Sequence, residues 1–137
     1  MAVASVMLPL RTPAPPFALR DVVSGQVYSL DSFKDKSALL VMFLCRHCPY
    51  VQHVQHEIAK IGQDYVDTGL GIIAISSNDP AYYPDDAPER LKEMAQRLGF
   101  RFPFCFDETQ EVAKAYKAAC TPDFYLFDAQ RRLVYRG

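Results

Sequence analysis

Two uninterrupted runs of apolar residues dominate the hydrophobic pattern of the chain. Residues 38–44 read ALLVMFL and residues 70–76 read LGIIAIS, without the alternation of a half-exposed strand. Both runs are therefore predicted to be central strands covered on two faces. Between them, apolar residues recur at spacings of three and four and predict an amphipathic helix over residues 48–65. A strand, a helix and a strand in this order predict a right-handed parallel pair.

Shorter elements are predicted on either side of this unit. The pattern and the turn residues predict hairpins at 17–22 with 26–30 and at 124–127 with 132–135, an extended segment at 102–106, and helices at 88–98 and 107–116. Asp107 and Gln110 are spaced as in a capping box, which predicts the start of the last helix. The alternation of strands and helices predicts an α/β fold with helices on both faces of a sheet.

The length and the proline distribution favour one domain with a short lead-in. The chain has 137 residues, of which 50% are hydrophobic, and this is enough for one core that needs no disulfide framework. Four of the ten prolines lie within the first sixteen residues. We therefore predict an extended lead-in over residues 1–16 and a folded domain over residues 17–137.

The charge balance and the lack of long apolar segments argue against several classes of protein. Lys and Arg number 15 and Asp and Glu number 16, for a net charge of -1, so the basic surface of a nucleic-acid-binding protein is not expected. No run approaches the ~18 to 20 apolar residues of a membrane span, and no basic segment precedes the N-terminal apolar residues as in a secretory signal. These features predict a cytoplasmic protein. In that reducing compartment, four cysteines indicate catalysis, redox chemistry or metal binding.

The motif Cys45-Arg46-His47-Cys48-Pro49 lies where the first buried strand turns into the long helix. Free N–H groups and the macrodipole at a helix N-terminus stabilise a thiolate, and we expect Arg46 and His47 to add positive charge. The pKa of Cys45 is therefore predicted to be lowered. Cys45 is also expected at the exposed end of the turn, so we predict that it attacks a disulfide while Cys48 resolves the mixed disulfide.

The same cysteines and the histidines near them raise a metal-binding alternative. A C-x-x-C motif is half of many zinc sites, but no second C-x-x-C and no C-x-x-H occurs in this chain. A metallochaperone would use His47, His53 or His56 with the cysteines to hold copper or zinc. The helical spacing, however, puts His56 on the solvent side and His53 on a flank of the predicted helix. Redox chemistry without a metal is therefore favoured.

Residues of the first hairpin and of the motif together resemble a known family. The segment Pro16-Phe-Ala-Leu-Arg-Asp21 is followed by Gly25, Tyr28, Ser29 and Leu30, and then by a strand that ends in Cys45-x-x-Cys48-Pro49. This combination resembles the redoxin branch of the thioredoxin-like superfamily, the alkyl hydroperoxide reductase and thiol-specific antioxidant (AhpC/TSA) family. The resemblance implies a thioredoxin-like three-layer sandwich with an N-terminal β-hairpin extension. It also implies that the first motif cysteine is the nucleophile and the second the resolving cysteine.

The resemblance implies further roles near the end of the chain. Thr121-Pro122 corresponds to a cis-proline loop, which packs against the cysteine pair and positions an extended substrate peptide. Cys120 would then lie beside the motif as a third thiol. It would either form a disulfide with Cys45 or be an unreactive small hydrophobic residue. Cys105 is expected to be an inert buried thiol. Related folds continue into a final helix that this sequence lacks, so we expect an uncovered sheet face, which predicts either a homodimer or a truncated chain.

The motif departs from the patterns of both peroxidases and thioredoxins. Val41 stands where the peroxidase pattern has proline, which argues against the alternative of a thiol-dependent peroxidase. Leu44 replaces the tryptophan that precedes the motif in thioredoxin. Leu39 occupies the position where thioredoxin has a buried acidic residue. A histidine before the second cysteine resembles oxidising members of the superfamily, so we predict a redox potential more oxidising than that of thioredoxin.

Together these features predict a cytoplasmic thiol-disulfide oxidoreductase. Its substrates would be protein or small-molecule disulfides and dithiols, and this exchange chemistry needs no cofactor. The predicted site combines the cysteine pair, the two residues between the cysteines that tune the thiolate, and the loop that positions the substrate, with a third thiol beside it: Cys45, Cys48, Arg46, His47, Thr121, Pro122 and Cys120.

Overall fold

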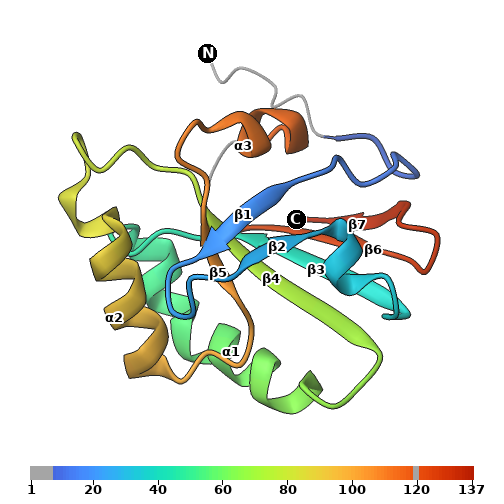
Figure 1. Ribbon diagram of the computed structural model, residues 1–137, viewed down its shortest axis with the longest axis horizontal. Coiled ribbons are helices and arrows are strands. Elements are labelled where there is room, and N and C mark those ends of the chain that lie inside the picture. The colour runs from blue at the N-terminus through green and yellow to red at the C-terminus, as the bar shows by residue number, and fades with distance from the viewer. Residues whose placement is uncertain (1–7, 119–120) are drawn as a thin grey trace.

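Within residues 8–118 and 121–137, which the computed structural model describes, seven strands form one mixed sheet with helices on both sides (Figure 1). In chain order the elements are β1 (Ala18–Asp21), β2 (Val27–Ser29), the 3-10 helix η1 (Leu30–Phe33), β3 (Ala38–Phe43), α1 (Pro49–Tyr65), β4 (Leu70–Ser76), the 3-10 helix η2 (Pro84–Asp86), α2 (Pro88–Leu98), β5 (Phe104–Phe106), α3 (Glu111–Tyr116), β6 (Asp123–Phe127) and β7 (Leu133–Arg136). The strand order across the sheet is β2-β1-β5-β4-β3-β6-β7.

The two apolar runs form adjacent strands in the middle of the sheet. β3 and β4 pair in parallel, and β5 continues the parallel pairing on the other side of β4. Every residue of β4 after Leu70 is buried, because helices or irregular chain cover both faces, and this burial explains the lack of alternation in the sequence. The two predicted hairpins form the antiparallel pairs β1 with β2 and β6 with β7.

Hydrophobic clusters fill both sides of the sheet. On one face, Val51 and Ile58 of α1 and Leu91 of α2 pack against the strands. On the other face, Tyr116 of α3 and Leu8 of the lead-in do so. Figure 1 shows α3 on the side of the sheet opposite α1 and α2. The predicted three-layer α/β architecture with an N-terminal hairpin is therefore confirmed.

The described part of the lead-in lies against the rest of the fold. The backbone N–H of Arg11 donates to the Leu133 carbonyl at 2.7 Å, so the lead-in runs beside β7. The Tyr116 hydroxyl donates to the Pro15 carbonyl at 2.8 Å, which joins the lead-in to α3. The described residues of this segment turn at Leu10 and Arg11, where Arg11 has a φ of 71°, and pack with α3 on one face of the sheet.

The last helix starts later than its sequence predicts. α3 begins at Glu111, after Gln110 with a left-handed φ of 65°. The carboxylate of Asp107, which is buried, accepts the N–H of Ala113 at 3.0 Å and the Ser77 hydroxyl at 2.8 Å. Asp107 therefore satisfies a backbone donor of the first helical turn from outside the helix. The predicted capping box of Asp107 with Gln110 is wrong.

Three apolar side chains on neighbouring strands β3, β6 and β7 remain partly uncovered. Leu40, Leu126 and Tyr135 lie on neighbouring strands in register and share the face that α1 covers elsewhere. Leu40 and Leu126 are half-buried, and Tyr135 is 56% exposed. We call these three residues the open strip. On the opposite face, α3 and the lead-in pack against the strands.

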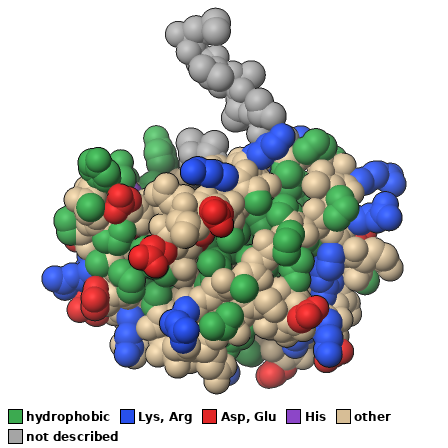
Figure 2. Space-filling view, turned by 45° about the horizontal axis from the view of Figure 1, so that its top comes forward, with side chains coloured by type: hydrophobic (Ala, Val, Ile, Leu, Met, Phe, Trp, Pro, Cys, Tyr) green, Lys and Arg blue, Asp and Glu red, His purple; other side chains and the backbone are tan. Residues whose placement is uncertain are grey.

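Charged side chains of both signs are interspersed with hydrophobic ones on the face of the molecule that Figure 2 shows. The whole chain has 15 basic and 16 acidic residues. On this face, basic and acidic side chains are intermixed and do not form separate patches. Among the helices of the described residues, none is long and apolar enough to cross a membrane.

Candidate functional site

The C-x-x-C motif lies in the connection between β3 and α1. Leu44 continues β3, and its N–H donates to the Ile75 carbonyl of β4. The helix begins only at Pro49, whose fixed φ suits the first helical position. Cys48 is the N-cap residue, with φ -72° and ψ 123°. Backbone groups of Tyr50 and Val51 in the first turn hydrogen-bond the Cys48 sulfur, whereas the Cys45 sulfur is hydrogen-bonded by the backbone of Cys48.

The two motif cysteines differ in exposure in the opposite sense to the prediction. Cys45 is 1% exposed and packs in the cluster formed by β3, α1 and α2. Cys48 is half-buried and lines a surface cavity. The predicted exposed position of Cys45 is wrong, because the chain at Cys45 is still leaving the buried strand. Both residues are free thiols.

The pKa values of the two thiols follow this burial. Burial raises the pKa of Cys45 to about 11, and the charge of Asp86 adds to the increase, although hydrogen bonds from Thr121 and the Cys48 backbone lower it. The predicted lowering of the Cys45 pKa is therefore wrong. Burial also raises the pKa of Cys48, but hydrogen bonds from the Thr121 side chain and from the backbone of Val51 and Tyr50 outweigh it, so the net pKa is lowered.

Thr121 contacts both sulfur atoms. Its hydroxyl lies 3.0 Å from the Cys45 sulfur, and its carbonyl accepts a hydrogen bond from the Cys48 thiol at 3.4 Å. The Thr121-Pro122 peptide bond is cis, as the resemblance implied. Cys120, the predicted third thiol, lies outside the described residues. Cys105 is fully buried, and burial raises its pKa to about 12, as expected for an inert thiol.

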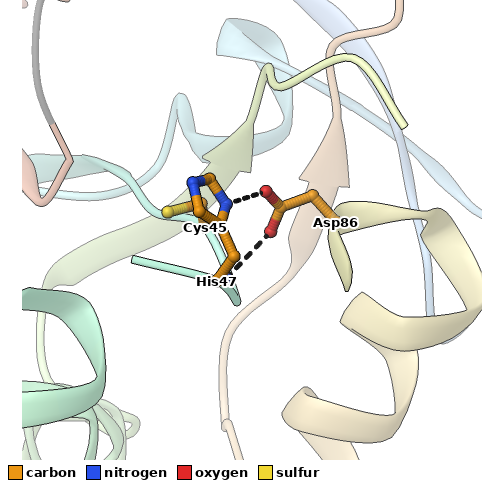
Figure 3. Close-up of side chains that lie close together, drawn as sticks. All are labelled: Cys45, His47 and Asp86. Carbon is orange, nitrogen blue, oxygen red and sulfur yellow. Dashed lines mark hydrogen bonds and ion pairs between the residues drawn. The ribbon is translucent and has the colours of Figure 1, made fainter. Parts of the chain in front are cut away.

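Asp86 is the site residue that sequence reasoning missed. This carboxylate, which is completely buried, accepts the backbone N–H of Arg46 at 2.6 Å and that of His47 at 3.3 Å. It also accepts the side-chain amide of Asn78 at 3.0 Å and is hydrogen-bonded to Nδ1 of His47 (Figure 3). The polar loop after β4 contains three aspartates, and no spacing in the sequence distinguishes Asp86 from the others.

Arg46 and His47, which the sequence predicts to stabilise the thiolate, both contact acidic side chains. The Arg46 guanidinium lies 3.2 Å from the carboxylate of Asp85, which is largely exposed. The His47 ring stacks on Tyr83, with centroids 4.4 Å apart, and contacts Asp86. Among the described residues, the contacts that shift the thiol pKa values come from Thr121, Asp86, the cysteines themselves and the backbone. Each predicted positive group is instead paired with an acid.

A cavity of about 220 Å³ opens beside the Cys48 thiol. It is bounded by strand β3, the loop after β4, the segment around α3 and the cis-proline loop, through Phe43, His47, Cys48, Ser77, Asn78, Tyr83, Ala113, Ala118 and Thr121. A disulfide that enters this cavity meets Cys48 directly, whereas Cys45 lies behind it at 1% exposure.

Metal binding at this site meets a geometric obstacle. The sulfur of Cys45, a ring nitrogen of His47 and a carboxylate oxygen of Asp86 all lie within 4.8 Å of one another. His53 and His56 are not part of such a cluster within the described residues. An ion bound by these groups would have to replace the direct hydrogen bond between His47 Nδ1 and Asp86. The cluster is therefore better described as a hydrogen-bonded network.

The similarity to known proteins agrees with this fold. The pattern of the AhpC/TSA family matches residues 10–136. A protein named thiol-disulfide oxidoreductase ResA, from Geobacillus kaustophilus, is 26% identical over 117 residues, which cover 84% of this chain and 61% of the relative. The chain thus spans about three fifths of the length of this curated relative.

Solved structures extend the comparison. An uncharacterized conserved protein from Geobacillus kaustophilus has a TM-score of 0.94 and 53% sequence identity, over 98% of this chain and 71% of that protein. The thioredoxin domain of a thiol-disulfide oxidoreductase from Bacteroides vulgatus has a TM-score of 0.77 at 21% identity, over 94% of this chain and 88% of that domain. The latter similarity shows the thioredoxin-like fold, as predicted.

Proposed function

Since the chain belongs to the AhpC/TSA family, we propose that it is a thiol-disulfide oxidoreductase in which Cys48 and Cys45 exchange electrons with a disulfide or dithiol substrate. The name of the ResA relative and the C-x-x-C motif support this reaction class. The observation that carries the proposal is the placement of the two thiols, with Cys48 in the cavity at the helix N-terminus and Cys45 buried behind it.

The first step is attack on the substrate. The Cys48 thiolate attacks one sulfur of the substrate disulfide, and the other substrate sulfur leaves with the electron pair and takes up a proton. The lowered pKa of Cys48 increases the thiolate fraction for this attack. The product is a mixed disulfide between Cys48 and the substrate.

The second step releases the substrate. Cys45 loses its proton and attacks the Cys48 sulfur, forming the Cys45–Cys48 disulfide and expelling the second substrate thiolate, which is then protonated. Two electrons pass from the protein to the substrate. The reverse sequence oxidises a dithiol. This order of attack is opposite to the order expected from the sequence.

Thr121 is placed to position the substrate in both steps. It touches both sulfurs and borders the cavity. A backbone segment at this position pairs with an extended peptide in the manner of strand addition, which would allow protein substrates as well as small ones.

Trapping of the mixed disulfide tests the proposal. We expect the Cys45→Ser variant to accumulate a mixed disulfide at Cys48 with oxidised glutathione, detected by mass spectrometry, while Cys48→Ser does not accumulate one. Cys105→Ala, which changes a buried thiol that does not line the cavity, should turn over normally. Trapping at Cys45 in Cys48→Ser would restore the order predicted from the sequence. Oxidation by peroxide in preference to disulfides would favour the peroxidase alternative.

Finer aspects of the role stay predictions. A cytoplasmic location and a contribution to redox homeostasis and antioxidant defence are consistent with thiol exchange. The open strip supports a homodimer, because exposed apolar side chains on a sheet favour association. Sedimentation of the wild-type protein and of Tyr135→Ser would test the dimer, and a monomeric wild type would contradict it.

A further inference from the structure

Asp86 holds the backbone of the two residues that separate the motif cysteines. One oxygen of its carboxylate, Oδ1, accepts the N–H of Arg46 at 2.6 Å and the N–H of His47 at 3.3 Å. Within residues 8–118 and 121–137, neither N–H donates to a backbone carbonyl. A side chain of η2, 40 residues after Arg46, therefore supplies the acceptor that a helix or a strand would otherwise supply.

The position of this carboxylate is itself fixed from several sides. Asp86 is 0% exposed and ends η2, and α2 begins two residues later at Pro88. Its second oxygen, Oδ2, accepts the side-chain amide of Asn78 at 3.0 Å and contacts the ring of His47 (Figure 3). A buried side chain with several partners is held in one conformation. The carboxylate therefore fixes the backbone of the motif relative to η2.

The two anchored residues determine how the cysteine sulfurs approach each other. Arg46 and His47 are the residues between Cys45 and Cys48 in the sequence. The two free thiols are hydrogen-bonded to each other, and the backbone of Cys48 hydrogen-bonds the Cys45 sulfur. A disulfide forms only when the two β-carbons lie about 3.5 to 4.5 Å apart. A backbone shift between the cysteines would therefore slow the formation of this bond.

We propose that Asp86 is a positioning residue that sets the rate at which the Cys45–Cys48 disulfide closes. This inference rests on the proposed oxidoreductase function, but it holds for either order of attack, because both orders end with closure of the same pair. In the closing step, one motif thiol loses its proton to water and attacks the other motif sulfur, which carries the substrate. The Cys45–Cys48 bond forms, the bond to the substrate breaks, and the substrate sulfur leaves with the electron pair and takes up a proton.

The other contacts of the motif loop use side chains and can be tested separately. The Arg46 guanidinium lies 3.2 Å from the carboxylate of Asp85, whose side chain is 63% exposed. The His47 ring stacks on Tyr83. Asp86 differs from both partners, because it binds the backbone and is completely buried.

Two substitutions at position 86 separate the anchor from the charge. Asp86→Asn keeps an oxygen that can accept both N–H groups but removes the charge, whereas Asp86→Leu has a similar size and no acceptor. The charge of Asp86 is among the causes that raise the pKa of Cys45. Loss of the charge alone would therefore make this thiol more reactive in both variants. Loss of the anchor occurs in Asp86→Leu alone.

A single turnover with one equivalent of Ellman's reagent measures the closing step. Attack by either motif cysteine releases one coloured thiolate and closure releases the second, so stopped-flow absorbance gives two rates. Every protein in the series carries Cys120→Ser, which leaves the motif pair and the buried Cys105 as the cysteines. We expect Asp86→Leu to slow the second release at least about tenfold without slowing the first. Asp86→Asn should keep the second release within about threefold of wild type.

Asp85→Leu is the matched control. It makes the same change at the neighbouring position, but Asp85 contacts only the side chain of Arg46 among the described residues. Both of its rates should lie within about twofold of wild type. A wild-type second rate in Asp86→Leu, or equal slowing of its two releases, would overturn the proposal, as would equal slowing of the second release in Asp86→Asn. A wild type that releases only one thiolate would instead contradict the proposed function.

Amide hydrogen exchange of the wild type gives a test that needs no variant, in case Asp86→Leu does not fold. Arg46 and His47 are half-buried and lie outside the helices and strands of the described chain. If Asp86 holds their N–H groups, NMR should show both exchanging at least about 100-fold more slowly than in an unfolded chain. Exchange of either group at the rate of an unfolded chain would contradict the anchor and overturn the proposal.

Discussion

The hydroxyl of Thr121 lies 3.0 Å from the sulfur of Cys45, although 76 residues separate them in the chain. The carbonyl of the same residue accepts a hydrogen bond from Cys48. The cis-proline loop therefore holds both thiols at once, and it does so from the side of the cavity into which Cys48 faces. A change at Thr121 should alter the reactivity of the pair.

We predict that Thr121→Val raises the pKa of Cys48. The Thr121 side chain is among the hydrogen bonds that lower this pKa, and valine has nearly the same shape without a hydroxyl. The thiolate fraction at neutral pH should fall, and the rate of alkylation of Cys48 by iodoacetamide should fall by about three- to tenfold. The pH dependence of alkylation measures both effects.

Thr68→Val is a suitable control for this prediction. The Thr68 hydroxyl binds the Tyr65 carbonyl in an exposed turn after α1, far along the helix from its N-terminus. An unchanged alkylation profile in Thr121→Val would show that the hydroxyl does not stabilise the thiolate.

Arg46→Ala should have little effect on the same alkylation profile. The sequence predicted that Arg46 stabilises the thiolate, but its guanidinium is paired with Asp85 at 3.2 Å. The backbone N–H of Arg46, which binds Asp86, is retained in the variant. We expect the rate of Cys48 alkylation at each pH to remain within about twofold of wild type. A large fall in this rate would restore the predicted role of the arginine.

The sequence predicted the scaffold well because burial leaves a local pattern. The apolar runs at 38–44 and 70–76 became β3 and β4, and the helical spacing between them became α1. The position of the motif at the strand–helix junction followed from the same pattern. Local patterns of this kind depend on residues close together in the chain, so one sequence is enough to find them.

The difference in burial between Cys45 and Cys48 depends on tertiary features that a local sequence pattern does not predict. The helix starts at Pro49, so Cys48 occupies the N-cap and Cys45 stays in the core. A shift of the helix start by three residues would exchange these environments. Asp86 reaches Arg46 across 40 residues of sequence, and its role requires the complete burial that only the folded loop provides. Both features are tertiary, and both decide the chemistry.

The stability of the protein should fall at alkaline pH. Burial, with the charge of Asp21, raises the pKa of Cys105 to about 12, above the ordinary value of 9.0. The unfolded chain therefore loses this proton first as the pH rises above about 9, so the stabilisation present below that pH is lost between about pH 9 and about pH 12. Each such group contributes a slope of about 1.4 kcal/mol per pH unit to the free energy of unfolding.

Urea unfolding of Cys105→Ala at several pH values tests this linkage. The variant should be less stable than wild type at neutral pH, and its stability should decline less steeply above about pH 9. Ile75→Val is the control, because Ile75 pairs with Cys105 in the sheet and is equally buried but does not titrate. Equal slopes in Cys105→Ala and the wild type would mean that Cys105 is not the group responsible.

The redox potential of the Cys45–Cys48 pair should be more oxidising than that of thioredoxin, about -270 mV. Stabilisation of the Cys48 thiolate favours the dithiol form over the disulfide, and the lowered pKa of Cys48 indicates that stabilisation. The raised pKa of Cys45 does not oppose it at pH 7, because this thiol is protonated there in any case. Equilibration with glutathione buffers, followed by alkylation and mass spectrometry, measures the potential. Thr121→Val should shift it toward more reducing values, because the variant loses a hydrogen bond to the thiolate. A wild-type potential at or below about -270 mV would contradict the link between the helix N-terminus, the thiolate and the stability of the reduced form.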